Sequence, residues 1–284
     1  MAVRIVTDST ADIPAERAKE LDITIVPLTV FFGDDAYLDG VELDNTNFYQ
    51  KLQSSKELPR TSQPSPAAFQ DAFKRLIDEG ADAILSVHLS SKLSGTYQSA
   101  CTARDALLSS GTVKAIPIEI VDSQSISTGM ALAIMQAAEN AQKGMNLEEI
   151  RVQLLDTLAR SRILAVLDTL EYVRRGGRIG AARAMLGNML SVKPIISLKD
   201  GEVAPVEQPR TRNKAYARVA QLISEMGPIE QVAVVEASED VGQQLSQVLN
   251  SIYQKAMPRY KLGAVLGTHT GPGTVGAVVV TARQ

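Results

Sequence analysis

Short apolar runs recur along the chain, each followed by a loop of small polar residues and then by apolar positions at helical spacing. Four segments share this layout, at residues 3–14, 83–100, 118–132 and 163–175. The first three predict strand–loop–helix units of a parallel sheet, in which ligands bind at the carboxyl ends of the strands. The loops at those ends carry hydroxyls and few charges, namely Asp8, Ser9, Thr10, Ser90, Ser91, Ser94, Asp122, Ser123 and Ser125.

Turn and capping signals organise the rest of the first half. Gly33-Asp34-Asp35 separates two β-prone runs and predicts a hairpin. Asp44 predicts the cap of a helix that runs to about Leu52, while Ser65-Pro66 predicts a cap and the first position of the next helix. A further helical pattern over 146–161 is expected to close the first domain.

The pattern changes after this helix. A hairpin is expected around Lys199-Asp200-Gly201, and no parallel strand–helix alternation follows it. The remaining segments predict a helix, a strand, a helix and two terminal strands, at 210–226, 231–237, 240–257, 262–270 and 276–283. We therefore predict an α/β fold of two domains. Residues 1–160 would form a parallel-sheet α/β/α domain, and residues 161–284 an α+β domain with a mixed or antiparallel sheet.

Composition and charge narrow the function. The net charge of −3, with its basic residues spread out, argues against nucleic-acid binding, which needs clustered Lys and Arg. The start MAVRIVTDST has no apolar signal region and no apolar run reaches the roughly 18 residues of a membrane span, so a cytoplasmic location is expected. One cysteine and two distant histidines give no recognisable zinc site, and no metal or cofactor is expected.

Hydroxyls near predicted helix starts are candidates for binding an anion. Thr61 and Ser62 precede a helix whose cap needs only Ser65, and a helix N-terminus favours negative charge. Ser94 precedes another helix, and Gly95 would remove a side chain where an anion could approach free backbone N–H groups. Hydroxyl and N–H groups together suit a carboxylate or a phosphate. For Ser94, capping and binding both remain open.

The segment GTHTGPGTVG (267–276) contains a G-x-G-x-x-G pattern and one of the two histidines. A strand pattern follows it, whereas a dinucleotide fingerprint leads into a helix, so we reject that interpretation. His269 is either a solvent-facing loop residue or a donor to an anionic ligand. A serine-dependent acyl ester or thioester hydrolase using Ser94 and His269 is the alternative, although the chain has no G-x-S-x-G elbow.

A cluster of arginines surrounds Gly176-Gly177 in the segment LEYVRRGGRIG (170–180). The glycines interrupt a helical pattern, and cations near a helix C-terminus complement its dipole. The arginines would therefore complete a helix end or bind an anion locally. They are Arg174, Arg175 and Arg178.

Seven segments together resemble the DegV family of bacterial fatty-acid-binding proteins. They occur in the family's order over nearly the whole chain, as IVTDSTADIP, TSQPSPAAF, LSSKLSGTYQSA, VDSQSISTG, LEYVRRGGRIG, KPIISLKDGEV and GTHTGPGTVG. The family includes the acyl-carrier subunits of bacterial fatty acid kinases. The resemblance implies a binding protein rather than an enzyme, with a kinase subunit as its partner.

The resemblance also implies where the ligand lies. One long-chain fatty acid such as palmitate would occupy a tunnel between the two domains. Its carboxylate would be held by Thr61 and Ser94, with His269 close by. The arginines at 174–178 would lie near the head group or on the surface that docks the kinase.

Overall fold

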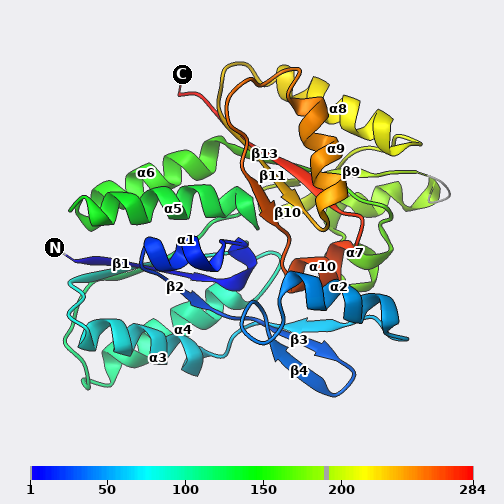
Figure 1. Ribbon diagram of the computed structural model, residues 1–284. Coiled ribbons are helices and arrows are strands. Elements are labelled where there is room, and N and C mark those ends of the chain that lie inside the picture. Colours follow the sequence, from blue (N-terminus) through cyan, green and yellow to red (C-terminus); the bar gives the residue numbers. More distant parts are fainter. Residues whose placement is uncertain (1, 189–191, 284) are drawn as a thin grey trace.

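The computed structural model describes residues 2–188 and 192–283, and its first half is built on a four-stranded parallel sheet (Figure 1). The strand order is β2-β1-β6-β7, and every neighbouring pair is parallel. The predicted strand–loop–helix units are therefore confirmed. The strands are β1 (Val3–Asp8), β2 (Ile23–Val26), β6 (Ala83–His88) and β7 (Ile118–Asp122).

Helices cover both faces of this sheet because successive strand residues point to opposite sides. Ile5 and Leu85 pack toward one layer, while Val6 and Ile84 pack toward the other. The first layer contains α1 (Ala15–Glu20), α5 (Thr128–Gln142) and α6 (Leu147–Arg160). The second contains α3 (Pro66–Asp78) and α4 (Thr96–Ser109).

The expected excursion after β2 is a small antiparallel sheet of order β4-β3-β5. Gly33, with φ +62°, lies in the turn of its hairpin, where a left-handed residue is needed. The strands are β3 (Thr29–Phe32), β4 (Asp35–Leu38) and β5 (Arg60–Ser62), and α2 (Asn45–Ser54) lies between the last two. Asp44 caps α2 and Ser65 caps α3, as predicted.

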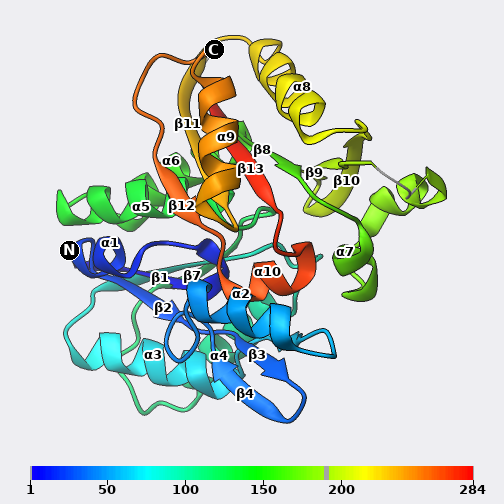
Figure 2. The same ribbon diagram turned by 45° about the vertical axis from the view of Figure 1, so that its right-hand side comes forward.

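The second half is a six-stranded mixed sheet of order β10-β9-β8-β13-β11-β12, in which only β11 and β12 pair in parallel. One face packs on α8 (Arg212–Ser224) and α9 (Glu239–Leu249), and the other packs on α5 and α6 (Figure 2). The strands are β8 (Ser161–Val166), β9 (Ile195–Lys199), β10 (Glu202–Glu207), β11 (Ile229–Glu236), β12 (Arg259–Lys261) and β13 (Val275–Thr281).

The predicted strand at 262–270 is wrong, because the segment forms the helix α10 (Ala264–Thr270). Its apolar run resembles a strand because residues 264–268 are buried on all sides. The helix contacts α2 and α7 (Glu171–Arg175), between which it lies in Figure 2. Gly267 permits this packing, since a Cβ there would lie 2.4 Å from Phe48 Cε1. Because these contacts are made with segments that are distant in the sequence, residues 262–270 carry no local signal for a helix.

Two other boundaries bear on the site. The helix predicted over 240–257 ends at Leu249, and a 3₁₀ helix, η2 (Gly180–Asn188), follows α7. A second short 3₁₀ helix, η1 (Ser9–Ala11), follows β1. Over the described ranges, no helix combines the length and apolarity needed to cross a membrane.

Candidate functional site

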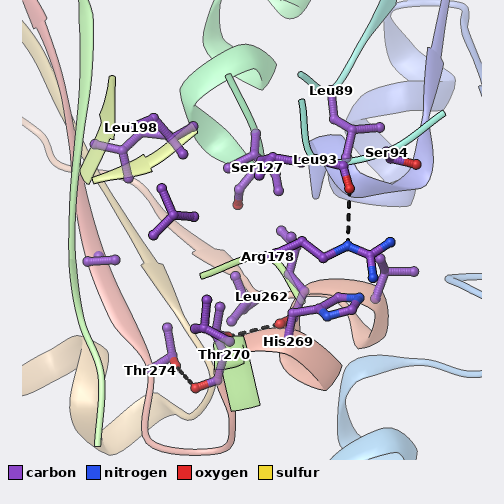
Figure 3. Close-up of a pocket in the computed structure, with 18 of the residues that line it drawn as sticks. Leu89, Leu93, Ser94, Ser127, Arg178, Leu198, Leu262, His269, Thr270 and Thr274 are labelled. Carbon is purple, nitrogen blue, oxygen red and sulfur yellow. Dashed lines mark hydrogen bonds between the residues drawn. The ribbon is translucent and has the colours of Figure 1, made fainter. Parts of the chain in front are cut away.

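A cavity lies between the carboxyl-end loops of the parallel sheet and one face of the mixed sheet (Figure 3). It contains about 1070 Å³ of empty space, including its opening to solvent. Most of its wall is aliphatic, as is usual for ligand cavities at the boundary of two layers. The loops contribute Leu89, Leu93 and Ile126, the mixed sheet contributes Ile163, Ala165, Ile196 and Leu198, and α10 contributes Val265 and Leu266.

Five of the residues singled out from the sequence line this cavity, and three do not. Those that line it are Thr61, Ser62, Ser94, Arg178 and His269, while Gly95, Arg174 and Arg175 lie outside its wall. Of the loop hydroxyls at the strand ends, only Ser94 reaches the cavity. Asp122, Ser123 and Ser125 line a separate, more polar pocket.

His269 lies in the last turn of α10 and is partly buried, so it is not a solvent-facing loop residue. Its Nε2 lies 2.8 Å from Thr61 Oγ1. Its buried Nδ1 has no hydrogen-bond partner among the described residues. Gly176 makes room for the ring, because a Cβ there would lie 2.2 Å from Nδ1. Burial, followed by the nearby Arg178 charge, lowers the pKa of His269 to about 4, so the ring is neutral near pH 7.

Ser94 lies one residue ahead of the helix cap, since the N-cap of α4 is Gly95. The Ser94 hydroxyl accepts a 3.3 Å hydrogen bond from Thr96 N and lies 2.9 Å from Thr96 Oγ1. The space beside Gly95 holds the Gln63 amide, and a Cβ on Gly95 would lie 2.6 Å from Gln63 Nε2. Gly95 thus lets the segment carrying Thr61 approach the segment carrying Ser94.

Only one of the three candidate arginines reaches the cavity. Arg178 donates from Nε to Leu93 O (3.2 Å) and from Nη1 to Gly176 O (2.6 Å). These bonds fix its guanidinium at the cavity mouth (Figure 3). Arg174 and Arg175 are exposed in the last turn of α7, and both pair with Glu171.

The hydrogen bonds do not join Ser94 to His269. Ser94 bonds within its own loop, and His269 Nε2 bonds to Thr61. A nucleophile needs a base within about 2.6–3.2 Å, and that base is usually oriented by a third group. Within residues 2–188 and 192–283, no hydrogen-bonded Ser94–His269 pair is present, and no group of three or more His, Cys, Asp and Glu residues could hold a metal ion.

A Ser–His–Asp chain that was not predicted from the sequence occurs elsewhere in the protein. Ser86 Oγ lies 2.7 Å from His88 Nε2, and His88 Nδ1 lies 2.9 Å from Asp8 Oδ2. All three side chains are fully buried, so no substrate reaches them. Asp8 also accepts 3.1 Å bonds from the backbone N of Thr10 and of Leu89. The chain therefore holds two strand-end loops in place.

Ser127 is a cavity residue that the sequence analysis also missed. It is buried, has φ +55°, and its hydroxyl donates to Asp12. A positive φ is strained for serine and marks a backbone held by its surroundings. Ser127 is placed in the cavity wall by a side-chain contact between the end of η1 and the start of α5. These two segments lie far apart in the sequence.

Because His269 is neutral in the folded protein, we predict that the stability of the protein depends on pH. The pKa of His269 is about 4 in the folded protein, below its ordinary value of 6.5. Between pH 4 and pH 6.5 the unfolded chain therefore binds a proton at this residue, whereas the folded protein does not. The contribution of the neutral His269 to the free energy of unfolding is fully present above pH 6.5. It decreases by about 2–3 kcal/mol as the pH falls to about 4.

Urea unfolding at several pH values, compared between the wild-type protein and His269→Gln, measures this effect. The difference between the two proteins is needed because burial raises the pKa of Asp39 to about 6, which changes stability in the opposite direction. Parallel stability curves for the two proteins from pH 7 to pH 4 would contradict the prediction.

The comparisons with known proteins agree with this architecture. A family model described as "Uncharacterised protein, DegV family" matches residues 2–282. A DegV domain-containing protein of Halalkalibacterium halodurans is 38% identical, covering 96% of each chain. A Thermus thermophilus structure described as fatty acid binding of a DegV family protein has a TM-score of 0.89 and 32% identity, covering 99% of this chain and 100% of the other.

A second solved structure extends the comparison. The stearic acid-binding protein of Eubacterium ventriosum has a TM-score of 0.90 and 28% identity, covering 98% of each chain. The similarities therefore span both sheets. Because the family model spans almost the whole chain and a relative shares 38% identity over 96% of it, this chain belongs to the DegV family.

Proposed function

We propose that the protein binds one long-chain fatty acid, such as palmitate, with its alkyl tail in the cavity and its carboxylate at Thr61, Ser94 and His269. The main support for this proposal is the cavity itself. Its wall is largely aliphatic, and the polar groups that can still form hydrogen bonds with a ligand lie in one part of it. Thr61 bonds His269, and Arg178 lies close enough to His269 to lower its pKa. Gln63 fills the space beside Gly95, next to Ser94.

Three further hydroxyls of the cavity wall are already bonded within the protein, which supports this choice of head-group site. Thr270 donates to Leu266 O and Thr274 to Thr270 O, each at 2.9 Å (Figure 3), while Ser127 donates to Asp12. Their protons are used within the protein. When His269 Nε2–H donates to Thr61 and the Thr96 hydroxyl donates to Ser94, the Thr61 and Ser94 hydroxyls both keep a proton that they can donate to an anion.

The energetics suit a ligand with a long tail. A sixteen-carbon acid has about 14 methylenes, whose burial contributes on the order of 11 kcal/mol at roughly 0.8 kcal/mol each. Association and ordering costs remove much of this. The tail would thus dominate the affinity, and the polar groups would fix the orientation.

The test is the lipid content of the purified protein. We expect a denatured extract of protein expressed in bacteria to yield about one fatty acid per chain by mass spectrometry. Delipidated protein should take up added palmitate, while 1-hexadecanol, which has a tail of the same length and no carboxylate, should bind more weakly. A lipid-free preparation that also fails to bind palmitate would refute the proposal.

We also propose that the protein is not an enzyme and presents its fatty acid to a cytoplasmic fatty acid kinase. Residues 1–160 and 161–284 would act as two domains that enclose the ligand. Arg174 and Arg175 are exposed, follow the cavity residue Val173 in the chain, and would supply a cationic docking surface.

The kinase proposal predicts a separation of binding from phosphorylation. The double variant Arg174→Glu/Arg175→Glu should bind palmitate with the wild-type Kd and yet lose most of its acyl phosphate formation with kinase and Mg-ATP, measured by trapping with hydroxylamine. Unchanged acyl phosphate formation would remove these arginines from the docking surface. Turnover of acyl esters that Ser94→Ala abolishes would instead favour a hydrolase.

A further inference from the structure

The start of α10 is held by two carboxyl groups from the first half of the chain. Gly263 N donates to Asp12 Oδ1 at 2.9 Å, and Ala264 N donates to Asp39 Oδ1 at 3.1 Å. Asp12 follows η1 with φ +55°, and Asp39 follows β4. The first N–H groups of a helix have no partner within the helix, so these bonds determine where α10 begins.

The arrangement costs free energy that a simple helix cap would avoid. Asp39 is 4% exposed and Asp12 is partly buried, and each lies near the other and near Asp8. Burial raises the pKa of Asp12 well above its usual range and that of Asp39 to about 6. Two carboxyl groups kept together without a cation are disfavoured in a protein interior. A single exposed Asp or Ser at the helix start would cap it without this cost.

The helix α10 meets the cavity wall at both of its ends. At one end, Asp12 also accepts the hydroxyl of Ser127, a cavity residue. At the other, His269 lies in the last turn of α10, with its Nδ1 beside Gly176 and its Nε2 at Thr61. Since α10 has only seven residues, a tilt of its first turn moves His269 directly.

We propose that Asp12 and Asp39 are positioning residues that fix the first turn of α10 and thereby place His269 at Thr61 and Ser127 in the cavity wall. For ligand affinity this inference rests on the proposed fatty acid binding. For the position of His269 it stands on the geometry of the protein alone.

The test compares Asp12→Ala and Asp39→Ala with Asp12→Asn and Asp39→Asn. Each alanine variant should raise the Kd for palmitate at least tenfold and shift the ¹H–¹⁵N signals of the His269 ring in delipidated protein. Asparagine keeps a side-chain oxygen that can accept the bond from Gly263 N or Ala264 N, and at position 12 its amide N–H can donate to the Ser127 hydroxyl, so the asparagine variants should stay within about threefold of the wild type. Asp44→Ala is the matched control, because the Asp44 side chain caps α2 and accepts its hydrogen bonds from Asn47 of that helix.

Wild-type Kd and unshifted His269 signals in both alanine variants would overturn the proposal. If an alanine variant does not fold, hydrogen exchange of the wild-type protein decides the question, since the Gly263 and Ala264 amides should be strongly protected and rapid exchange of both would refute it. If the wild-type protein binds no palmitate, the proposed function fails, while the His269 signals still test the positioning role.

Discussion

Ala165→Leu is expected to raise the Kd for palmitate by about a hundredfold. Ala165 lies on β8 with its side chain on the cavity face, and its partner in the register is Gly276 on β13, which also lines the cavity. Its other neighbour in the sheet is Ile196. The two smallest residues of this wall thus lie side by side, and we assign the part of the cavity in front of them to the tail. Displacing four methylenes at about 0.8 kcal/mol each costs about 3 kcal/mol, or roughly a hundredfold in Kd.

A second measurement distinguishes a filled cavity from a damaged core. Leucine in an empty hollow buries new apolar surface, so the delipidated variant should be more stable than the wild type. Leucine forced into a packed site would instead destabilise the protein by about 1–3 kcal/mol. The loss of affinity should shrink for shorter acids, which reach less of the cavity. These quantities come from thermal unfolding of delipidated protein and from calorimetric titration with acids of increasing length.

Ala36→Leu is the matched control. Ala36 is exposed on β4, outside the cavity wall, so the same substitution there should leave the affinity unchanged. An Ala165→Leu protein that is stable and binds palmitate as tightly as the wild type would show that the tail does not pass this wall.

Local signals in the sequence were sufficient for most of the fold. Asp44 and Ser65 are caps whose side chains bond amides three residues ahead, and such short-range bonds can be predicted from sequence alone. The parallel sheet followed from apolar runs that are buried on both faces. The segment 262–270 could not be predicted in this way, because its helix depends on contacts with Asp12, Asp39 and Phe48, all more than 200 positions away.

The residues of the candidate site also differ in whether local sequence signals predict them. The Thr61 loop carries hydroxyls beyond what its helix cap needs, and Ser94 precedes a helix start where it could cap or bind; both features are visible in the sequence. The resemblance to the DegV family pointed to His269, although its partner and its neutral state depend on burial and on Arg178. Ser127 gave no local signal, because its place in the wall follows from a positive φ and a bond to Asp12.

The double variant Thr61→Val/Ser94→Ala is expected to bind palmitate several hundredfold more weakly than the wild type. Each hydroxyl would donate a charge-assisted hydrogen bond to the carboxylate, and such bonds contribute about 1.5–3 kcal/mol each. If both contact the same carboxylate, the two single losses should not simply add, since the first substitution lets the head group shift. Ser91→Ala, an exposed serine in the same loop as Ser94, should have no effect.

Binding of methyl palmitate distinguishes the contribution of the charged head group to the affinity from that of the alkyl tail. The ester keeps the tail and removes the charge, so the wild type should bind it much more weakly than palmitate, whereas the double variant should bind the two nearly equally. This equality is specific to lost carboxylate recognition, because a variant that merely loosened the cavity would lose affinity for both ligands. If the double variant keeps normal thermal stability and still prefers palmitate by the wild-type ratio, Thr61 and Ser94 do not hold the carboxylate, and Arg178 at the cavity mouth becomes the next residue to test.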